Sequence, residues 1–330
     1  MLATPVDAHV HVWSDDTARF PLAPGFTAAD LWLPRFTPFE YDISTAALDS
    51  AQRGRGVPPR MRINLVQMTW YGLDHSYILH LIRSDPSRFS GTGVVPAVCD
   101  VSLPDPGAAM RALAAQGIAA FRVRGGISGG GVAPPNGRWL DTPGHESMFE
   151  AAATEQLALS FLGGPGDLPE LDRMMTKHPN APVILDHFMG CARADVVGPG
   201  DVDLFCDLGR RHANCFAKLG PLDHFAAESQ PPYLSMLPLL RRVIEAFGPG
   251  RCMWESDSGG PGCPLVEQNG LGYDMSGEYG GSLSLITEGC ADFLSEEGVG
   301  MILGRTAEGI FFPAERAARL KHATALVPRL

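Results

Sequence analysis

The sequence lacks the features typical of nucleic-acid-binding and membrane-spanning proteins. Its 26 lysines and arginines form no cluster and are outnumbered by 37 aspartates and glutamates, which argues against a nucleic-acid or anionic-membrane surface. No apolar run approaches the ~20 residues that a bilayer span needs. No basic segment followed by an apolar run opens the chain, so we expect a cytoplasmic protein. A small-molecule substrate is the expected partner, and nothing in the sequence excludes a homo-oligomer.

Cysteine pairs and phosphate-binding loops are missing as well. The seven cysteines show no C-x-x-C spacing, and an odd number cannot all pair within one chain, so we expect reduced and mostly buried thiols. The glycine-rich run at 125–131 lacks the Gly-Lys-Ser/Thr ending of a phosphate loop. No helix starts where the dinucleotide fingerprint needs one. We interpret this run as a flexible loop.

Residues 5–13 are the most informative stretch that the chain does contain. Valine and alanine alternate there with polar side chains, and in a strand with a period of two His9 and His11 project to the same face. Two adjacent imidazoles can bind one metal ion or polarise a bound carbonyl. The alternative is a strand end that carries two solvated histidines.

Strand-like segments followed by helix-like segments recur eight times. The expected strands lie at 5–13, 61–67, 93–98, 118–124, 157–162, 183–187, 215–219 and 252–257. Strands that alternate with helices favour a parallel sheet, and eight is the number that closes a barrel. The sequence therefore predicts an α/β fold, a single-domain (β/α)8 TIM barrel, with loop insertions at 14–42 and 259–281.

The site of such a barrel lies at the carboxyl ends of the strands, where this chain carries charged and imidazole side chains. We expect the following residues to converge there: His9, His11, Arg122, Arg124, His187, Lys218 and Asp257. Arg122 and Arg124 share a strand face and suit a substrate carboxylate, although a structural pairing at the rim is an equal alternative. Loop residues expected to line the pocket are Trp70, Tyr71, His75 and Tyr273.

Four segments resemble the amidohydrolase superfamily, in its amidohydrolase-related (amidohydrolase 2) branch with the sugar lactonases and 2-pyrone-4,6-dicarboxylate lactonase. They are Asp7-Ala8-His9-Val10-His11, Leu185-Asp186-His187, Ala217-Lys218-Leu219 and Trp254-Glu255-Ser256-Asp257. The resemblance covers nearly the whole chain. It implies hydrolysis, with His9, His11, His187 and Asp257 in the catalytic positions.

The chain also departs from the pattern of that branch. The fifth strand ends without the histidine that many one-zinc members and the decarboxylases use as a ligand, and the fourth offers Arg122 and Arg124 where a carboxylated lysine would bridge two metals. After His187 the sequence is Phe-Met-Gly-Cys, which differs from the pyrone dicarboxylate enzyme, and Glu255 replaces a small residue. These departures imply one metal at most and leave the substrate open.

We predict a hydrolase of a small carboxylated lactone or ester. Asp257 is the expected base for water, and the carbonyl is polarised either by one divalent cation on His9, His11, His187 and Asp257 or by the histidines alone. Zinc is the favoured cation, because it prefers nitrogen ligands. The competing interpretations are a non-oxidative decarboxylase or isomerase, a non-catalytic binding barrel, and purely structural roles for Asp257 as a loop cap and for His187 paired with Asp186.

Overall fold

The computed structural model describes residues 5–42, 61–97, 103–125, 137–192, 198, 200–259 and 276–312. Within these residues, eight parallel strands form one sheet in chain order from β1 to β8. The sheet closes where Val10 bridges Ser258 in parallel, and the backbone N–H of His11 donates to the Ser258 carbonyl at 2.8 Å. The predicted (β/α)8 TIM barrel is confirmed.

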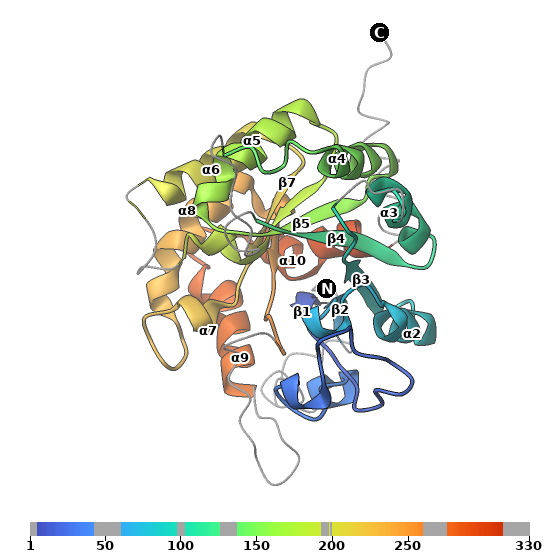
Figure 1. Ribbon diagram of the computed structural model, residues 1–330. Coiled ribbons are helices and arrows are strands. Elements are labelled where there is room, and N and C mark those ends of the chain that lie inside the picture. Colours follow the sequence, from blue (N-terminus) through green and yellow to red (C-terminus); the bar gives the residue numbers. More distant parts are fainter. Residues whose placement is uncertain are drawn as a thin grey trace.

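Figure 1 shows the strands at the centre with helices around them. The strands are β1 (Val6–Val10), β2 (Arg62–Val66), β3 (Phe89–Gly93), β4 (Ile118–Arg124), β5 (Ala158–Leu162), β6 (Val183–Leu185), β7 (Cys215–Leu219) and β8 (Cys252–Trp254). The helices are α2 (Ser76–Ser84), α3 (Pro106–Ala114), α4 (Pro143–Glu155), α5 (Leu168–Lys177), α6 (Asp201–Arg211), α7 (Leu222–Phe225), α8 (Leu237–Phe247), α9 (Ser276–Ser284), α10 (Glu296–Gly300) and α11 (Thr306–Phe311).

Local chemistry explains why the helices begin where they do. Asp105 accepts a hydrogen bond from the N–H of Ala108, and Thr142 does the same from His145, so both side chains cap a helix start. Each cap is followed by a proline, whose fixed φ suits the first helical position. These caps place α3 and α4 directly before and after β4.

The third strand lies earlier in the chain than predicted. We expected it at 93–98, whereas β3 spans Phe89–Gly93, a glycine-rich stretch that resembles a loop. The glycines are needed for close packing, because a Cβ on Gly91 would lie 2.7 Å from Ile118 Cδ1. The sixth and eighth strands are also shorter than predicted, so His187 and Asp257 lie in the turns that follow β6 and β8.

The inside of the barrel changes from apolar to charged along the strands. Residues two apart share a face, and three strands show the step: Phe216 to Lys218, Ile184 to Asp186, and Met253 to Glu255. The apolar positions pack in one cluster with Ala307, Ile310 and Phe311 of α11. α11 therefore closes the amino-terminal end of the barrel beneath the charged layer.

Replacing Phe311 with alanine is expected to lower the free energy of unfolding by about 3–5 kcal/mol, the usual cost of emptying a buried phenylalanine site. Phe311 is fully buried in the apolar cluster. Urea unfolding followed by circular dichroism measures the change. Phe39→Ala serves as the matched control, because Phe39 is 63% exposed and its loss should change stability by less than ~0.5 kcal/mol. Equal effects of the two substitutions would contradict the role of α11.

Residues 14–42 are held over the ends of β1 and β2. Trp13 bridges Phe36, and the N–H of Ala23 donates to the Trp70 carbonyl at 2.7 Å. Most of the expected insertion at 259–281, the 126–131 part of the glycine-rich run and Tyr273 fall outside the described residues.

Two expectations from composition can be compared with the described part of the chain. Its free cysteines are buried: Cys191, Cys206, Cys215, Cys252 and Cys290. Burial raises the pKa of the Cys215 thiol to about 12, so that thiol stays protonated at neutral pH. None of the helices described has both the length and the apolar character of a membrane span.

Candidate active site

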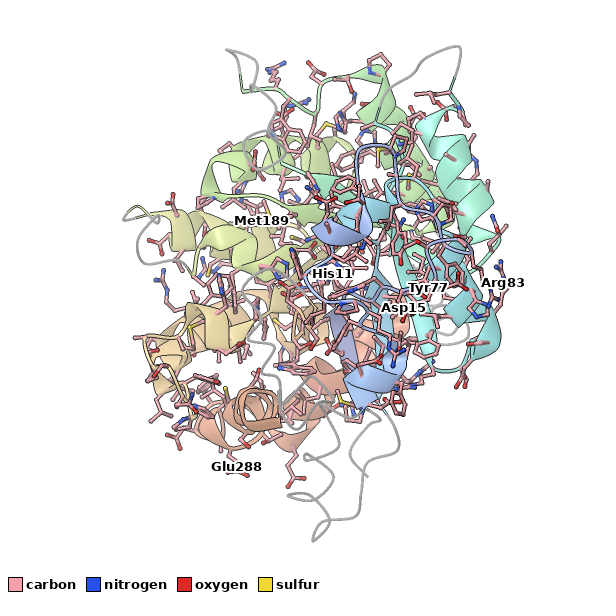
Figure 2. The ribbon with its side chains drawn as sticks, turned by 60° about the horizontal axis from the view of Figure 1, so that its bottom comes forward. His11, Asp15, Tyr77, Arg83, Met189 and Glu288 are labelled. Carbon is pink, nitrogen blue, oxygen red and sulfur yellow. The ribbon has the colours of Figure 1, made fainter. Side chains whose placement is uncertain are left out.

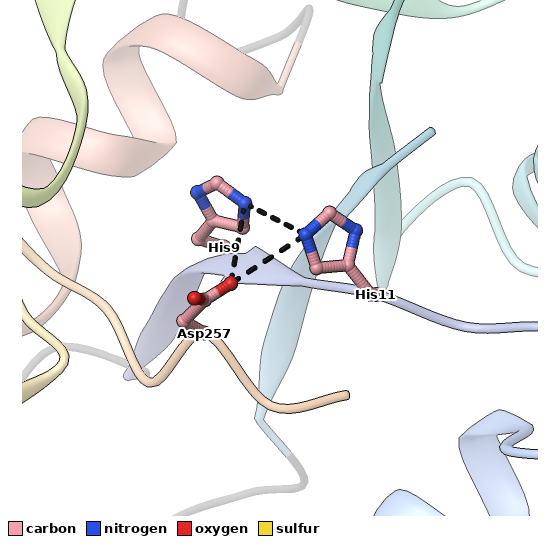
Figure 3. Close-up of side chains that lie close together, drawn as sticks. All are labelled: His9, His11 and Asp257. Atoms are coloured by element: carbon pink, nitrogen blue, oxygen red, sulfur yellow. Dashed lines mark hydrogen bonds and ion pairs between the residues drawn. The ribbon is translucent and has the colours of Figure 1, made fainter. Parts of the chain in front are cut away.

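Three side chains from opposite ends of the sequence meet at the carboxyl end of the barrel. His9 lies on β1, His11 one residue beyond its end, and Asp257 in the turn after β8. The two Nε2 atoms are 3.2 Å apart, and each lies 3.5 Å from Asp257 Oδ1 (Figure 3). In the view of Figure 2, His11 lies near the middle of the ring of helices, whereas Arg83 and Glu288 lie at the periphery.

The orientation of His11 is fixed by the backbone of β2. Its Nδ1 lies 2.9 Å from the carbonyl oxygen of Val66, which can only accept, so Nδ1 carries the proton. Burial, followed by the charge of Arg122, lowers the pKa of His11 well below its usual value. The ring is therefore neutral, with the lone pair of Nε2 on the side of Asp257.

His9 has two competing partners at its other nitrogen. Its Nδ1 lies 3.1 Å from Lys218 Nζ, which can only donate, and 3.2 Å from Glu255 Oε2, which accepts when ionised. Burial and then the charge of Lys218 lower the pKa of His9 well below its usual value, so this ring is neutral too. Bonding to Lys218 puts the proton on Nε2, and bonding to Glu255 puts it on Nδ1.

His187 approaches the same centre from the turn after β6. Its Nδ1 lies 2.7 Å from Glu255 Oε1, and its Nε2 lies 3.9 Å from Asp257 Oδ2. Burial alone would lower the pKa of His187, but the carboxylates of Glu255 and Asp257 outweigh it and raise the pKa to about 9. Without a bound cation, His187 is therefore an imidazolium at neutral pH.

The backbone is strained where two of these side chains attach. His187, Phe188 and Met189 have φ values of 52°, 53° and 51°, and Asp257 has a φ of 53°. Left-handed backbone costs roughly 1–2 kcal/mol per residue for side chains other than glycine. Strain of this kind concentrates at functional sites, where the surrounding structure holds a side chain in place.

Asp257 is an acid that the protein makes weaker. Burial raises its pKa to about 6, although the nearby His187 charge works in the opposite direction. Among the described residues, its buried Oδ1 atom has no hydrogen-bond partner. At neutral pH the carboxylate is mostly ionised and still close enough to its pKa to exchange a proton.

A second buried network lies beside this centre. Lys218 Nζ is 2.9 Å from Asp186 Oδ1, which also accepts from Ser160 Oγ at 2.7 Å. Burial would raise the pKa of Asp186, but Lys218 and then Arg122 lower it below its usual value. Arg122 Nε lies 3.8 Å from Asp186 Oδ2, and this buried Nε has no hydrogen-bond partner among the described residues.

The structure brings six of the predicted site residues together. They are His9, His11, Arg122, His187, Lys218 and Asp257. The other predicted residues that the structure describes make their contacts outside this cluster. Arg124 is exposed at the end of β4 and donates to Thr69 Oγ1 at 2.5 Å. Trp70 packs edge-on against Trp13, with ring centroids 5.2 Å apart. The Tyr71 hydroxyl accepts from the N–H of Ser14 at 3.0 Å, and His75 Nε2 accepts from Val94 N–H at 2.9 Å.

Glu255 and Asp186 take part in the site but were not predicted as functional residues. Both are fully or almost fully buried, and Glu255 contacts both His9 and His187. A signal for Glu255 was present, because in the expected strand at 252–257 it lies two residues before Asp257 and would share its face. Asp186 is adjacent to His187, and only the fold shows that it pairs with Lys218.

The donor set fits a single divalent cation. Two possible groups are His9–His11–Asp257 and His9–His187–Glu255. The first is better suited, because its Nε2 and Oδ1 atoms lie within 3.5 Å of one another and Asp257 Oδ1 has no hydrogen-bond partner among the described residues. In the second group, His187 Nδ1 is already bonded to Glu255 Oε1. Ligands ~2.0–2.1 Å from a tetrahedral zinc are about 3.3 Å apart, close to the 3.2 Å and 3.5 Å separations found here.

A curated protein resembles part of this chain. The curated relative L-fucono-1,5-lactonase from Burkholderia ambifaria is 26% identical over 189 residues, which cover 56% of this chain and 60% of the relative. The chain thus matches less than two thirds of that protein's length.

Solved structures show the same fold. A probable 2-pyrone-4,6-dicarboxylic acid hydrolase from Acinetobacter baumannii, with citric acid bound, is 18% identical with a TM-score of 0.64, over 93% of this chain and 99% of that chain. An amidohydrolase from Burkholderia multivorans with bound zinc is 18% identical with a TM-score of 0.64, over 94% and 100%. The profile of the amidohydrolase family matches residues 6–311, which include all eight strands, and the chain therefore belongs to the amidohydrolase 2 family.

Proposed function

We propose that this protein is a hydrolase that opens a small carboxylated lactone or ester, with Asp257 as the general base. The observation that carries the proposal is the convergence of three imidazoles on a buried carboxylate whose pKa is raised to about 6. A base works best when its pKa lies near the operating pH. Asp257 would take a proton from water as the water oxygen attacks the carbonyl carbon, and return it to the leaving alkoxide.

The developing oxyanion needs positive charge or a hydrogen-bond donor beside the base. His187 supplies a donor when it is protonated, since its Nε2 lies 3.9 Å from Asp257 Oδ2, on the same side of the site. A divalent cation on His9, His11 and Asp257 would polarise the carbonyl as a Lewis acid. Zinc is the cation that suits two imidazoles and one carboxylate, and the zinc bound to the Burkholderia multivorans protein supports this choice.

The surroundings of Arg122 support the proposal that the substrate carries a carboxylate. The residue is only 8% exposed, and its buried Nε has no hydrogen-bond partner among the described residues, although a guanidinium offers five donors. A carboxylate of the substrate can fill that need with two parallel hydrogen bonds. The Acinetobacter baumannii structure holds a carboxylated compound of this kind, citric acid. The L-fucono-1,5-lactonase supports the lactone part of the proposal and not the carboxylate, because a sugar lactone is uncharged.

The Arg122→Gln variant is expected to raise the KM for a carboxylated lactone about 10–100-fold, the worth of a hydrogen bond between charged groups. The KM for a neutral lactone of the same ring size should change less than about threefold, because that substrate has no carboxylate for Arg122 to bind. The substrates come from a screen of sugar lactones and dicarboxylate lactones, with release of acid as the signal.

Arg242→Gln is the matched control, because Arg242 pairs with Asp203 in the helical layer and is about half exposed. It should leave both KM values unchanged. If Arg122→Gln weakens charged and neutral substrates equally, Arg122 does not recognise a substrate carboxylate.

A further inference from the structure

Glu255 occupies a position at the base of the site that links two of its histidines. It follows β8 directly, is fully buried, and has one carboxylate oxygen facing each ring. Oε1 lies 2.7 Å from His187 Nδ1 and accepts the backbone N–H of the same residue at 3.2 Å. Oε2 lies 3.2 Å from His9 Nδ1. The carboxylate thus spans from β1 to the turn after β6.

The neighbouring strand leaves room for this side chain. A Cβ on Gly220, just after β7, would lie 2.8 Å from Glu255 Cγ and 2.2 Å from the Glu255 carbonyl oxygen. Any residue other than glycine at position 220 would therefore have to displace Glu255 or its backbone. A long acidic side chain at 255 and glycine at 220 fit together.

The two carboxylate oxygens of Glu255 are not equally satisfied. Oε1 accepts two hydrogen bonds, whereas Oε2 is buried and has no hydrogen-bond partner among the described residues. Asp257 Oδ1 is in the same condition. A buried acceptor without a donor is unfavourable, so both oxygens need a partner that the present arrangement does not supply.

We propose that Glu255 is a positioning residue that accepts from Nδ1 of His9 and of His187 at once, and so turns the Nε2 lone pair of His9 toward a cation shared with His11 and Asp257. The inference rests on the cation site of the proposed function. With a cation present, both unpartnered oxygens are satisfied, because Asp257 Oδ1 binds the ion and Oε2 accepts from His9. A carboxylate behind a metal-bound histidine is a general way of fixing the ring and its tautomer.

Lys218 can release His9 without losing its charge partner. Its Nζ lies 2.9 Å from Asp186 Oδ1 and 3.8 Å from Glu255 Oε2, so the ammonium group remains paired when His9 Nδ1 turns into a donor. Glu255 Oε2 is already in place, 3.2 Å from His9 Nδ1. Lys218 Nζ, 3.1 Å from the same nitrogen, would turn away from it toward Asp186, because two donor groups at that distance repel each other.

The test is the zinc affinity of Glu255→Gln, measured by competition with a coloured chelator. Glutamine keeps the volume but has one acceptor oxygen and one donor NH2, so it can accept from only one of the two histidines. The dissociation constant for zinc is expected to rise about 10–100-fold, the usual result of losing an outer partner of a metal ligand. Proton NMR of the zinc-loaded protein should show the Nδ1–H signal of one imidazole ring moved upfield from its wild-type position, because that N–H has lost its carboxylate acceptor.

Glu170→Gln is the matched control, because Glu170 is a buried carboxylate of α5 that bonds Arg173 and lies in the helical layer. Its zinc affinity should equal that of the wild type. If Glu255→Gln fails to fold, Glu255→Asp replaces it, since the shorter side chain keeps the charge and reaches only one histidine.

Wild-type affinity in the Glu255 variant that folds, or an unchanged NMR signature, would overturn the inference. A wild-type protein that binds no zinc would overturn it as well. The proposed hydrolysis would then be judged separately, from the activity of the Asp257 variant.

Discussion

Turnover of a carboxylated lactone is expected to fall about 100-fold or more when Asp257 is replaced with asparagine, the usual range for loss of a general base. Asparagine keeps the size of the side chain but cannot take a proton from water. Because the base acts in the transition state, kcat and kcat/KM should fall together. The measurement is a steady-state rate on the best substrate of the screen, at concentrations well above KM.

Stability separates this chemical role from a structural one. Burial raises the pKa of Asp257 to about 6, which means that the fold disfavours the charged form. The neutral asparagine should therefore keep or increase the free energy of unfolding at neutral pH. Asp172→Asn, which removes a carboxylate paired with Arg211 and His212, should leave turnover unchanged. Near-normal turnover in a folded Asp257→Asn protein would refute the role of Asp257 as the base.

The second large effect is expected on metal content. His11→Asn removes one of the two Nε2 atoms of the proposed site, so bound zinc should fall from one equivalent per chain to nearly none. The weakening should exceed the ~10–100-fold that loss of an outer partner causes, because a direct ligand is lost. Elemental analysis after dialysis against a dilute chelator gives the stoichiometry.

His80→Asn is the control for this experiment, since His80 lies on α2 and its ring packs against Phe20. It should retain one equivalent of zinc. A full equivalent in His11→Asn would show that the ion binds elsewhere. Two equivalents in the wild type would contradict a one-ion site, in which β4 provides Arg122 and Arg124 and no bridging lysine.

Local periodicity explains which parts of the fold could be predicted. The period of two in β1 puts His9 and His11 on one face, and their Nε2 atoms are indeed 3.2 Å apart. The repeated strand and helix pattern was sufficient for the barrel, because each unit is recognisable by itself. β3 was predicted at the wrong place because its sequence, Phe-Ser-Gly-Thr-Gly, is rich in glycine. The glycines leave room for Ile118 and His75, two side chains that are distant in the sequence.

The site was harder to predict because it depends on depth along each strand and on partners from other strands. Arg122 and Arg124 share a face of β4, yet one is buried beside Asp186 and the other reaches Thr69 at the surface. The turn that carries His187 has left-handed backbone at residues 187–189, but none of these residues is a glycine, so the sequence does not predict that turn. Only the closed barrel brings Lys218 and Glu255 to the same nitrogen of His9.

Mass spectrometry of the product formed in heavy-oxygen water tests hydrolysis most directly. The substrate is a carboxylated lactone that the wild-type protein consumes, and Asp257→Asn is run beside it. We predict a product equal to the substrate plus one water, with one heavy oxygen in the new carboxylate and far less product from the variant. A product that has lost carbon dioxide, or that contains no solvent oxygen, would contradict the account.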